Sequence, residues 1–134
     1  MMLFVQFCSA VLEGLYDVFG DDYPTPDGTC VRDYIHVSDL AQAHLAALDH
    51  VAASDANLIV NCGYGHGYSV KEAIATVKKV TGVDFPVSMD KRRDGDAAKL
   101  ISKASKIREV FGWTPRFDDL EVIVRTAYEW EKKL

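Results

Sequence analysis

Residues 19–44 read FGDDYPTPDGTCVRDYIHVSDLAQAH, and this stretch decides the fold. Two prolines and an Asp-Gly pair predict a turn-rich loop over residues 20–29. Residues 30–37 alternate and are rich in β-branched and aromatic side chains, so they predict a strand. A Ser-Asp pair then opens a helix over residues 38–52. A loop, a strand and a helix in this order are typical of proteins that mix both kinds of element.

The flanking sequence continues this alternation of short strands and helices. On the N-terminal side, residues 4–13 predict a helix and residues 15–19 a short strand. On the C-terminal side we expect, in order, a buried strand over 57–62, a Gly-rich turn over 63–68, a helix over 69–82, an edge strand over 85–88, a charged loop over 89–99, a helix over 103–111 and a final helix from Asp118. The predicted fold class is therefore α/β, or an α+β-like fragment of it, with too few strands for a full doubly wound sheet.

Capping signals and apolar stripes mark the predicted helices. Ser69 with Glu72 forms one capping box, and Asp118 with Glu121 forms a second. Each helix also repeats apolar residues at helical spacing. These residues are Ala41, Leu45, Leu48 and Ala52 in the first stripe, Val70, Ala73, Ile74, Val77 and Val80 in the second, and Leu120, Ile123, Val124 and Ala127 in the third.

Length and composition bound the function. The chain has 134 residues, of which 49% are hydrophobic and 26% charged, as in an ordinary globular domain. A dinucleotide-binding domain together with a substrate domain needs about twice this length. A net charge of −5 argues against a nucleic-acid partner held by the overall field. No apolar run reaches the roughly 20 residues of a membrane helix, and residues 1–12 lack the features of a signal peptide.

The cysteines indicate a reducing, cytoplasmic setting. Cys8, Cys30 and Cys62 are odd in number and widely spaced, with no CxxC pair. This pattern predicts neither a disulfide framework nor a metal site. We expect each to be a small buried apolar side chain.

Two basic segments could carry chemistry. Arg32 follows a flexible loop, where a guanidinium can fork onto a phosphate or carboxylate; the alternative is a salt bridge to Asp33 or Asp39. Residues 91–96, KRRDGD, place three cations before a Gly turn. Between residues 89 and 116, eight Lys and Arg face four Asp and Glu, so the local charge is +4 inside an acidic chain. A dipolar molecule with one basic loop suits a small anionic ligand, and a solvated loop is the alternative.

Three other patterns point to structure rather than catalysis. His36 could be an acid or base, but a buried structural histidine is the simpler reading. GYGHGYS at 63–69 lacks the third glycine of a dinucleotide fingerprint, so a strand-to-helix turn is favoured. Tyr128 and Lys132 form a YxxxK spacing that chance explains on a surface helix.

Four segments together resemble a known family. FGDDYPTPDGTCVRDYIHVSDLAQAH, NLIVNCGYGHGYSVKEAI, RRDGDAAKL and SKIREVFGWTPRFDDLEVIV resemble, in order and spacing, the C-terminal part of the UDP-glucose 4-epimerases, over about residues 11–132. These are NAD-dependent enzymes of the extended short-chain dehydrogenase family. The resemblance implies that residues 1–134 are the UDP-sugar-binding portion and that most of the Rossmann domain, with its NAD loop and its catalytic Ser, Tyr and Lys, is absent.

The resemblance also implies a set of site residues. Arg32 and Arg93 correspond to the two cations of the diphosphate site, and Asp96 to the acceptor of a ribose hydroxyl. Asp94 and Gly95 form the turn between them. Asp17, Val18 and Phe19 correspond to the segment beside the uracil and ribose. No catalytic, NAD-binding or metal-binding residue is expected in this chain.

Two functions follow as alternatives. The first is a substrate-binding portion of an NAD-dependent UDP-glucose/UDP-galactose 4-epimerase of galactose metabolism, inactive alone and completed by a separate or missing Rossmann domain. The second is a non-catalytic nucleotide-sugar-binding or vestigial module, or part of a related nucleotide-sugar dehydratase or decarboxylase. In the complete family enzyme, helix 38–52 and strand 57–62 would pack against Rossmann elements. Without those elements we expect an exposed apolar patch and self-association.

Overall fold

A computed structural model describes residue 11, residues 14–54 and residues 57–133. Its strands are β1 (Tyr16–Phe19), β2 (Val31–Arg32), β3 (Tyr68–Ser69), β4 (Val87–Asp90) and β5 (Lys99–Leu100). Its helices are α2 (Val37–Ala53), α3 (Val70–Thr81), α4 (Ser105–Phe111) and α5 (Leu120–Glu131). The helix predicted over 4–13 lies outside the described residues, apart from Val11, as does Cys8. The mixture of short strands and helices confirms the predicted fold class.

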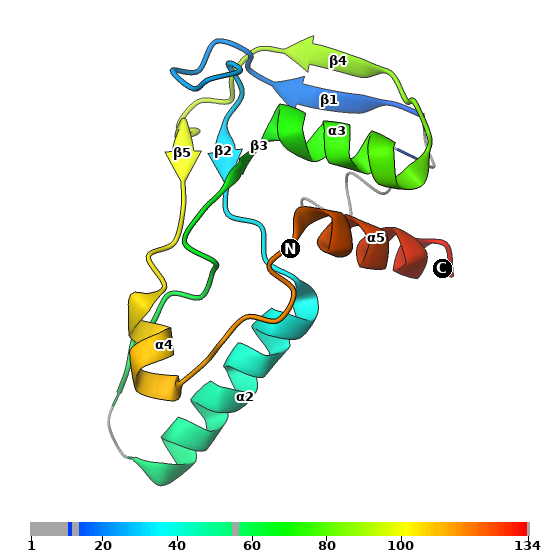
Figure 1. The fold of residues 1–134 in the computed structure, drawn as a ribbon. Coiled ribbons are helices and arrows are strands. Elements are labelled where there is room, and N and C mark those ends of the chain that lie inside the picture. Colours follow the sequence, from blue (N-terminus) through cyan, green and yellow to red (C-terminus); the bar gives the residue numbers. More distant parts are fainter. Residues whose placement is uncertain (1–10, 12–13, 55–56, 134) are drawn as a thin grey trace.

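Two small sheets are joined by two loops that run alongside each other (Figure 1). In the first sheet β1 pairs in parallel with β4, with Phe19 opposite Asp90. In the second, β2 lies between antiparallel β3 and parallel β5. Residues 20–30 connect β1 to β2, and residues 91–98 connect β4 to β5. The two connections therefore leave one sheet and enter the other as neighbours.

Three predicted strands differ from the structure. The strand expected over 30–37 is paired only at β2, because the chain turns into α2 at Val37. The edge strand expected over 85–88 is shifted to β4, where Pro86 contributes only its carbonyl, to the Tyr16 N–H at 3.1 Å. The prediction over 57–62 is wrong, since no described residue forms a ladder with that segment. An apolar run becomes a strand only where a partner supplies the hydrogen bonds.

Helices α3 and α5 pack against each other beside the first sheet and form the main core (Figure 1). The predicted stripe of α3 is confirmed: Ala73 and Val77 are fully buried, and Ser69 and Glu72 form the predicted capping box. The α5 stripe is also confirmed. The other core side chains come from β1, from the loops, from α2 and from α4, and include Val18, Tyr23, Cys30, Ala43, Phe85, Ile107 and Trp113.

The start of α5 differs from the prediction by one residue. Asp119, not Asp118, is the N-cap, and its side chain accepts a hydrogen bond from the Val122 N–H at 3.0 Å. Asp118 instead pairs with His66, at 2.8 Å. With Asp119 as N-cap, Val122 occupies the third helical position, so the second predicted capping box does not form; Glu121 pairs with Lys79 instead. Either of two adjacent aspartates can serve as an N-cap, so the sequence alone does not distinguish them. Tertiary contacts determine which one caps the helix.

Helix α2 turns its apolar stripe outward. Ala41, Leu45, Leu48 and Ala52 are all exposed, and Leu48 retains 62% of its surface. The buried face is instead made by Asp39 and Ala43. The helix begins one residue earlier than predicted, with His36 as N-cap: its ring Nδ1 accepts from the Ser38 N–H at 3.0 Å. None of the described helices is long and apolar enough to cross a membrane.

Candidate functional site

The predicted site residues gather where the two connecting loops meet the ends of the parallel strands. β1 and β4 both end at this point, at Phe19 and Asp90. Ligands of open sheets bind outside the carboxyl ends of parallel strands, because loops diverge there. The loop from Lys91 to Ala97 is exposed throughout, so its charged groups face solvent.

Arg32 reaches from β2 to the second loop. Its Nη2 lies 3.2 Å from Asp96 Oδ1, and its Nη1 donates to the carbonyl oxygens of Ala97 and Val31 at 2.8 and 2.9 Å. The predicted alternative of a salt bridge to Asp33 or Asp39 is wrong, since Arg32 pairs with Asp96. Two of the predicted site residues, 64 positions apart, are therefore in direct contact.

Arg93 lies on the other side of the same turn. Its guanidinium carbon sits 3.6 Å from the centroid of the Phe19 ring, which joins two predicted site residues from β1 and the loop. The Asp96 N–H donates to the Arg93 carbonyl at 3.3 Å across the turn of Asp94 and Gly95. Gly95 has φ +83°, a conformation that glycine adopts readily. The turn therefore fixes Arg93 and Asp96 relative to each other.

The two residues before Phe19 are placed differently. Asp17 is exposed and accepts a hydrogen bond from the Ser88 hydroxyl on β4. Val18 is 2% exposed and points into the core, since successive strand residues face opposite sides. Only the backbone of Val18 could therefore face a ligand at this edge.

Sequence reasoning missed a second contact between the loops. Arg92 donates through Nε to Asp22 Oδ1 at 2.5 Å, and through Nη2 to the Asp22 carbonyl. Its guanidinium carbon also lies 4.1 Å from the centroid of the Tyr23 ring. Burial raises the pKa of the Tyr23 phenol, and nearby Asp96 raises it further. The only sequence signal was the pair of consecutive arginines, which does not say which of the two faces a ligand.

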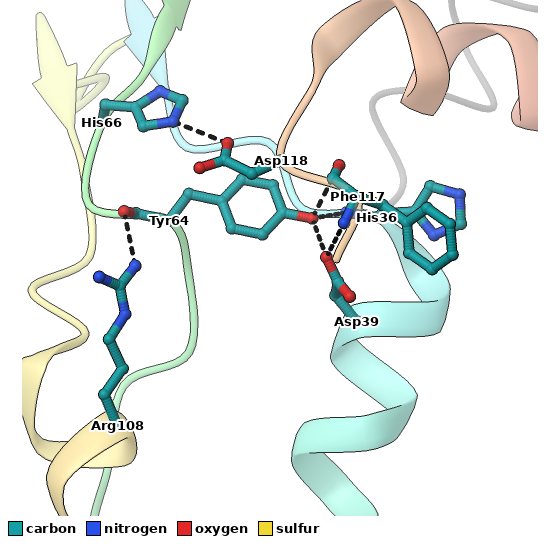
Figure 2. A network of polar contacts seen from close by, with 7 residues as sticks. All are labelled: His36, Asp39, Tyr64, His66, Arg108, Phe117 and Asp118. Atoms are coloured by element: carbon teal, nitrogen blue, oxygen red, sulfur yellow. Dashed lines mark hydrogen bonds and ion pairs between the residues drawn. The ribbon is translucent and has the colours of Figure 1, made fainter. Parts of the chain in front are cut away.

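A separate buried network ties α2 to the segment before α5 (Figure 2). The Asp39 carboxylate is 1% exposed and accepts from the Tyr64 hydroxyl at 2.6 Å and from the Phe117 N–H at 2.9 Å. The Arg116 N–H donates to its other oxygen at 3.0 Å. Burial acts to raise the pKa of Asp39, but these hydrogen bonds outweigh it and hold the pKa below its ordinary value. The network satisfies a buried charge and has no access for a substrate.

His36 belongs to the same network, as the structural reading predicted. It is 5% exposed, and its Nε2 lies 2.9 Å from the Thr126 hydroxyl. Its ring stacks on Phe117 with centroids 4.4 Å apart. Burial lowers the pKa of His36, and Asp39 only partly opposes this.

The Gly-rich turn does not fit a dinucleotide. A Cβ on Gly63 would lie 2.2 Å from Ser102 Oγ and 2.3 Å from Asp33 Oδ2. A Cβ on Gly67 would lie 2.8 Å from the Arg32 carbonyl. These glycines make room for the protein's own groups, including the hydrogen bond from the Ser102 N–H to Asp33 at 3.0 Å. The turn is filled by side chains of this chain and offers no cradle for a pyrophosphate.

The chemistry available at the loop site is binding rather than proton transfer. Two guanidinium groups can donate paired hydrogen bonds to phosphate oxygens. The Asp96 carboxylate beside them can accept from hydroxyl groups. An elongated ligand with a phosphate group and a neighbouring diol matches this set.

Comparison with known proteins gives a consistent result. A family model described as GDP-mannose 4,6 dehydratase matches residues 2–126. A UDP-glucose 4-epimerase of Azospirillum brasilense is 51% identical over 117 residues, which are 87% of this chain and 34% of that protein.

Solved structures agree in fold. The UDP-Glc/GlcNAc 4-epimerase of Campylobacter jejuni is 50% identical with a TM-score of 0.87, over 98% of this chain and 41% of that one. The UDP-glucose 4-epimerase of Bifidobacterium longum, solved in complex with NAD+ and UDP, is 37% identical with a TM-score of 0.82, over 97% of this chain and 38% of that one. The chain thus spans about a third of the length of the first curated relative and about 40% of these structures.

Proposed function

Because the chain belongs to the GDP-mannose 4,6 dehydratase family of extended short-chain dehydrogenases, with UDP-glucose 4-epimerases as relatives, we propose that it is the UDP-sugar-binding portion of such an epimerase. The observation that carries the proposal is the contact of Arg32 with Asp96 across 64 positions, with Arg93 in the same turn. The resemblance to the epimerases assigns these three residues to one ligand, and their proximity supports that assignment over a solvated loop.

Each residue has a defined task in the proposed site. Arg32 and Arg93 bind the diphosphate, one from each side of the turn, and Asp96 accepts a ribose hydroxyl. Phe19 supplies an apolar wall below the Arg93 guanidinium, 3.6 Å away. Asp94 and Gly95 shape the turn, while Asp17 and the Val18 backbone line the edge beside the base.

The redox chemistry of the family lies outside this proposal. In a complete enzyme NAD would supply the redox chemistry, but the only Gly-rich turn among the described residues is filled by Asp33 and Ser102. We therefore propose that the chain alone is inactive and that the NAD-binding portion of the fold completes it. No proton or hydride step is assigned to the residues described here.

The outward face of α2 is the proposed contact with that NAD-binding portion. Leu45, Leu48 and Val51 are each more than half exposed, and Ile59 in the neighbouring unpaired segment is 87% exposed. The curated relatives are about three times as long as the matched region, so they hold enough chain to cover such a face. A contiguous apolar face is an association surface, and in the absence of its partner it favours self-association.

The test is a UDP titration with and without a separately supplied NAD-binding portion. The chain is titrated with UDP by calorimetry, alone and mixed with the separately expressed NAD-binding portion of a UDP-glucose 4-epimerase. We expect UDP binding, and interconversion of UDP-glucose and UDP-galactose with NAD, in the mixture only. Epimerisation by the purified chain alone, or no UDP binding in either sample, would refute the proposal.

A further inference from the structure

We propose that Arg92 is a positioning residue: it clasps the basic turn at 91–96 to the 20–29 loop and so holds Arg93 and Asp96 in place. This inference rests on the proposed function for its meaning, because the groups held are those assigned to the UDP-sugar. Arg92 itself is assigned no ligand contact. Its side chain is turned to Asp22 and Tyr23, while that of Arg93 is turned to Phe19.

Three contacts make up the clasp. Nε and Nη2 of Arg92 both donate to Asp22, one to the carboxylate and one to the backbone carbonyl. The carbon of the same guanidinium lies over the Tyr23 ring, 4.1 Å from its centroid. A planar group that is held at two edges and on one face has little freedom, so the backbone at residue 92 is fixed. Because Arg93 is the next residue, its backbone is restrained as well.

The Tyr23 ring is a rigid base for this contact. Tyr23 is 4% exposed, and its N–H and carbonyl hold the loop closed through Gly28 and Thr25, at 2.8 and 2.7 Å. Its hydroxyl is buried and forms no hydrogen bond with a described residue. The ring, and not the hydroxyl, therefore carries the contact with Arg92.

Gly20 is the residue that lets the two loops approach. Its N–H donates to the Asp90 carbonyl at 2.9 Å, which extends the β1–β4 pairing by one step. With φ at +90°, a Cβ at this position would lie 2.6 Å both from Arg92 Cγ and from the Tyr23 ring. A side chain on residue 20 would therefore separate the arginine from the ring.

The clasp affects the local geometry of the turn rather than the stability of the core. The Arg92 side chain is 39% exposed and that of Asp22 is 71% exposed, so their ion pair adds little to global stability. Its effect is confined to the turn, which has one backbone hydrogen bond of its own, from Asp96 to Arg93. Loss of Arg92 should therefore loosen the turn while α3 and α5 stay intact.

The experiment compares Arg92→Gln with Lys91→Gln in the full chain. Both remove one positive charge from the turn, but the Lys91 side chain makes no hydrogen bond or ion pair with a described residue. Amide hydrogen exchange is measured at Asp96, whose N–H forms the backbone hydrogen bond of the turn, and, as an internal standard for global unfolding, in α3. We expect Arg92→Gln to speed exchange at Asp96 by about 10-fold, the scale of a cation–π contact plus an exposed ion pair, while α3 and the Lys91→Gln variant stay as in the wild type.

Tyr23 supplies a second pair of variants. Tyr23→Phe keeps the ring and should preserve wild-type exchange, whereas Gly20→Ala should reproduce the loosened turn. UDP affinity is then measured with the NAD-binding portion present, where Arg92→Gln should weaken binding about 10-fold and Lys91→Gln much less. Equal exchange at the Asp96 amide in Arg92→Gln and Lys91→Gln would overturn the clasp. Absence of UDP binding by the wild type would instead refute the proposed function, and the exchange comparison would still decide the clasp.

Discussion

Helices α3 and α2 both carry an apolar stripe, but the stripe of α3 is buried and that of α2 is exposed. The stripe of α3 packs against α5 and belongs to the buried core, with Ala73 and Val77 fully buried. The stripe of α2 is open, with Leu45 and Leu48 more than half exposed, and the segment after it is unpaired. Periodicity therefore shows that a helix has an apolar face, but not whether the same stretch of chain covers it. The closed region lies beside the loops of the proposed site, and the open region is the proposed contact with the rest of the fold.

The largest expected contrast is between matched truncations in the two regions. Ile123→Ala empties a site in α5 that is 4% exposed, and should lower the free energy of unfolding by about 2–5 kcal/mol. Leu48→Ala removes a similar side chain from the open face and should change it by less than about 0.5 kcal/mol. Urea denaturation at a concentration where the chain is monomeric measures both. If both variants lowered the free energy of unfolding by similar amounts, the α2 face would have to be buried in the isolated chain, which would contradict the account.

The second contrast lies within α2 itself. Asp39→Ala leaves the N–H groups of Arg116 and Phe117 without their acceptor and leaves the Tyr64 hydroxyl with only the Phe117 carbonyl, so it should cost about 2–3 kcal/mol. Asp49→Ala, on the exposed side of the same helix, is the control and should be nearly neutral. The same denaturation assay applies. A neutral Asp39→Ala variant would show that α2 is not anchored through this carboxylate.

The third contrast concerns the caps. Ser69→Ala removes the side chain that accepts from the Glu72 N–H at 3.0 Å, and should cost about 1 kcal/mol. Ser38→Ala tests the start of α2, where the His36 ring and not this serine is the cap, so a change well below that is expected. Equal losses from the two substitutions would contradict the assignment of the caps.

These caps also show how far the sequence alone could reach. Local signals gave α3 in full, because the capping box, the stripe and Gly82 with φ +72° all act within one helix. The errors lie where tertiary partners decide. Asp118 pairs with His66 instead of capping the helix, and residues 57–62 form no ladder with any strand in the described part of the chain.

In the candidate site, too, some features were predicted from the sequence and others depend on tertiary contacts. The resemblance to the epimerases supplied Arg32, Arg93 and Asp96 as a set. The direct contact between Arg32 and Asp96 was not predicted, because it joins residues 64 positions apart. The contact of Arg92 with Asp22 and Tyr23 was also missed, since it depends on how the two loops leave the sheet.

The smallest expected effect is a pH dependence that arises at the N-cap of α2. Burial lowers the pKa of His36 below its ordinary 6.5, so the unfolded chain takes up this proton more readily than the folded one. The contribution of neutral His36 to the free energy of unfolding is therefore complete above pH 6.5 and is lost as the pH falls from 6.5 towards the folded pKa. For one proton, the free energy of unfolding changes by at most about 1.4 kcal/mol per pH unit. His36→Asn keeps a capping side chain and should flatten the dependence between pH 7 and 5. An unchanged slope in thermal melts over that range would assign the titration to another group.

The most direct measurement of the central claim is UDP affinity in Arg32→Ala and Arg93→Ala. Calorimetry is done with the NAD-binding portion supplied, and Lys91→Ala in the same loop serves as the charge control. Each arginine variant should lose roughly 1.5–3 kcal/mol of binding free energy, the scale of hydrogen bonds to a charged group, and the lysine variant much less. Wild-type affinity in both arginine variants would contradict the account, since no shared site for a diphosphate would then exist between the two loops.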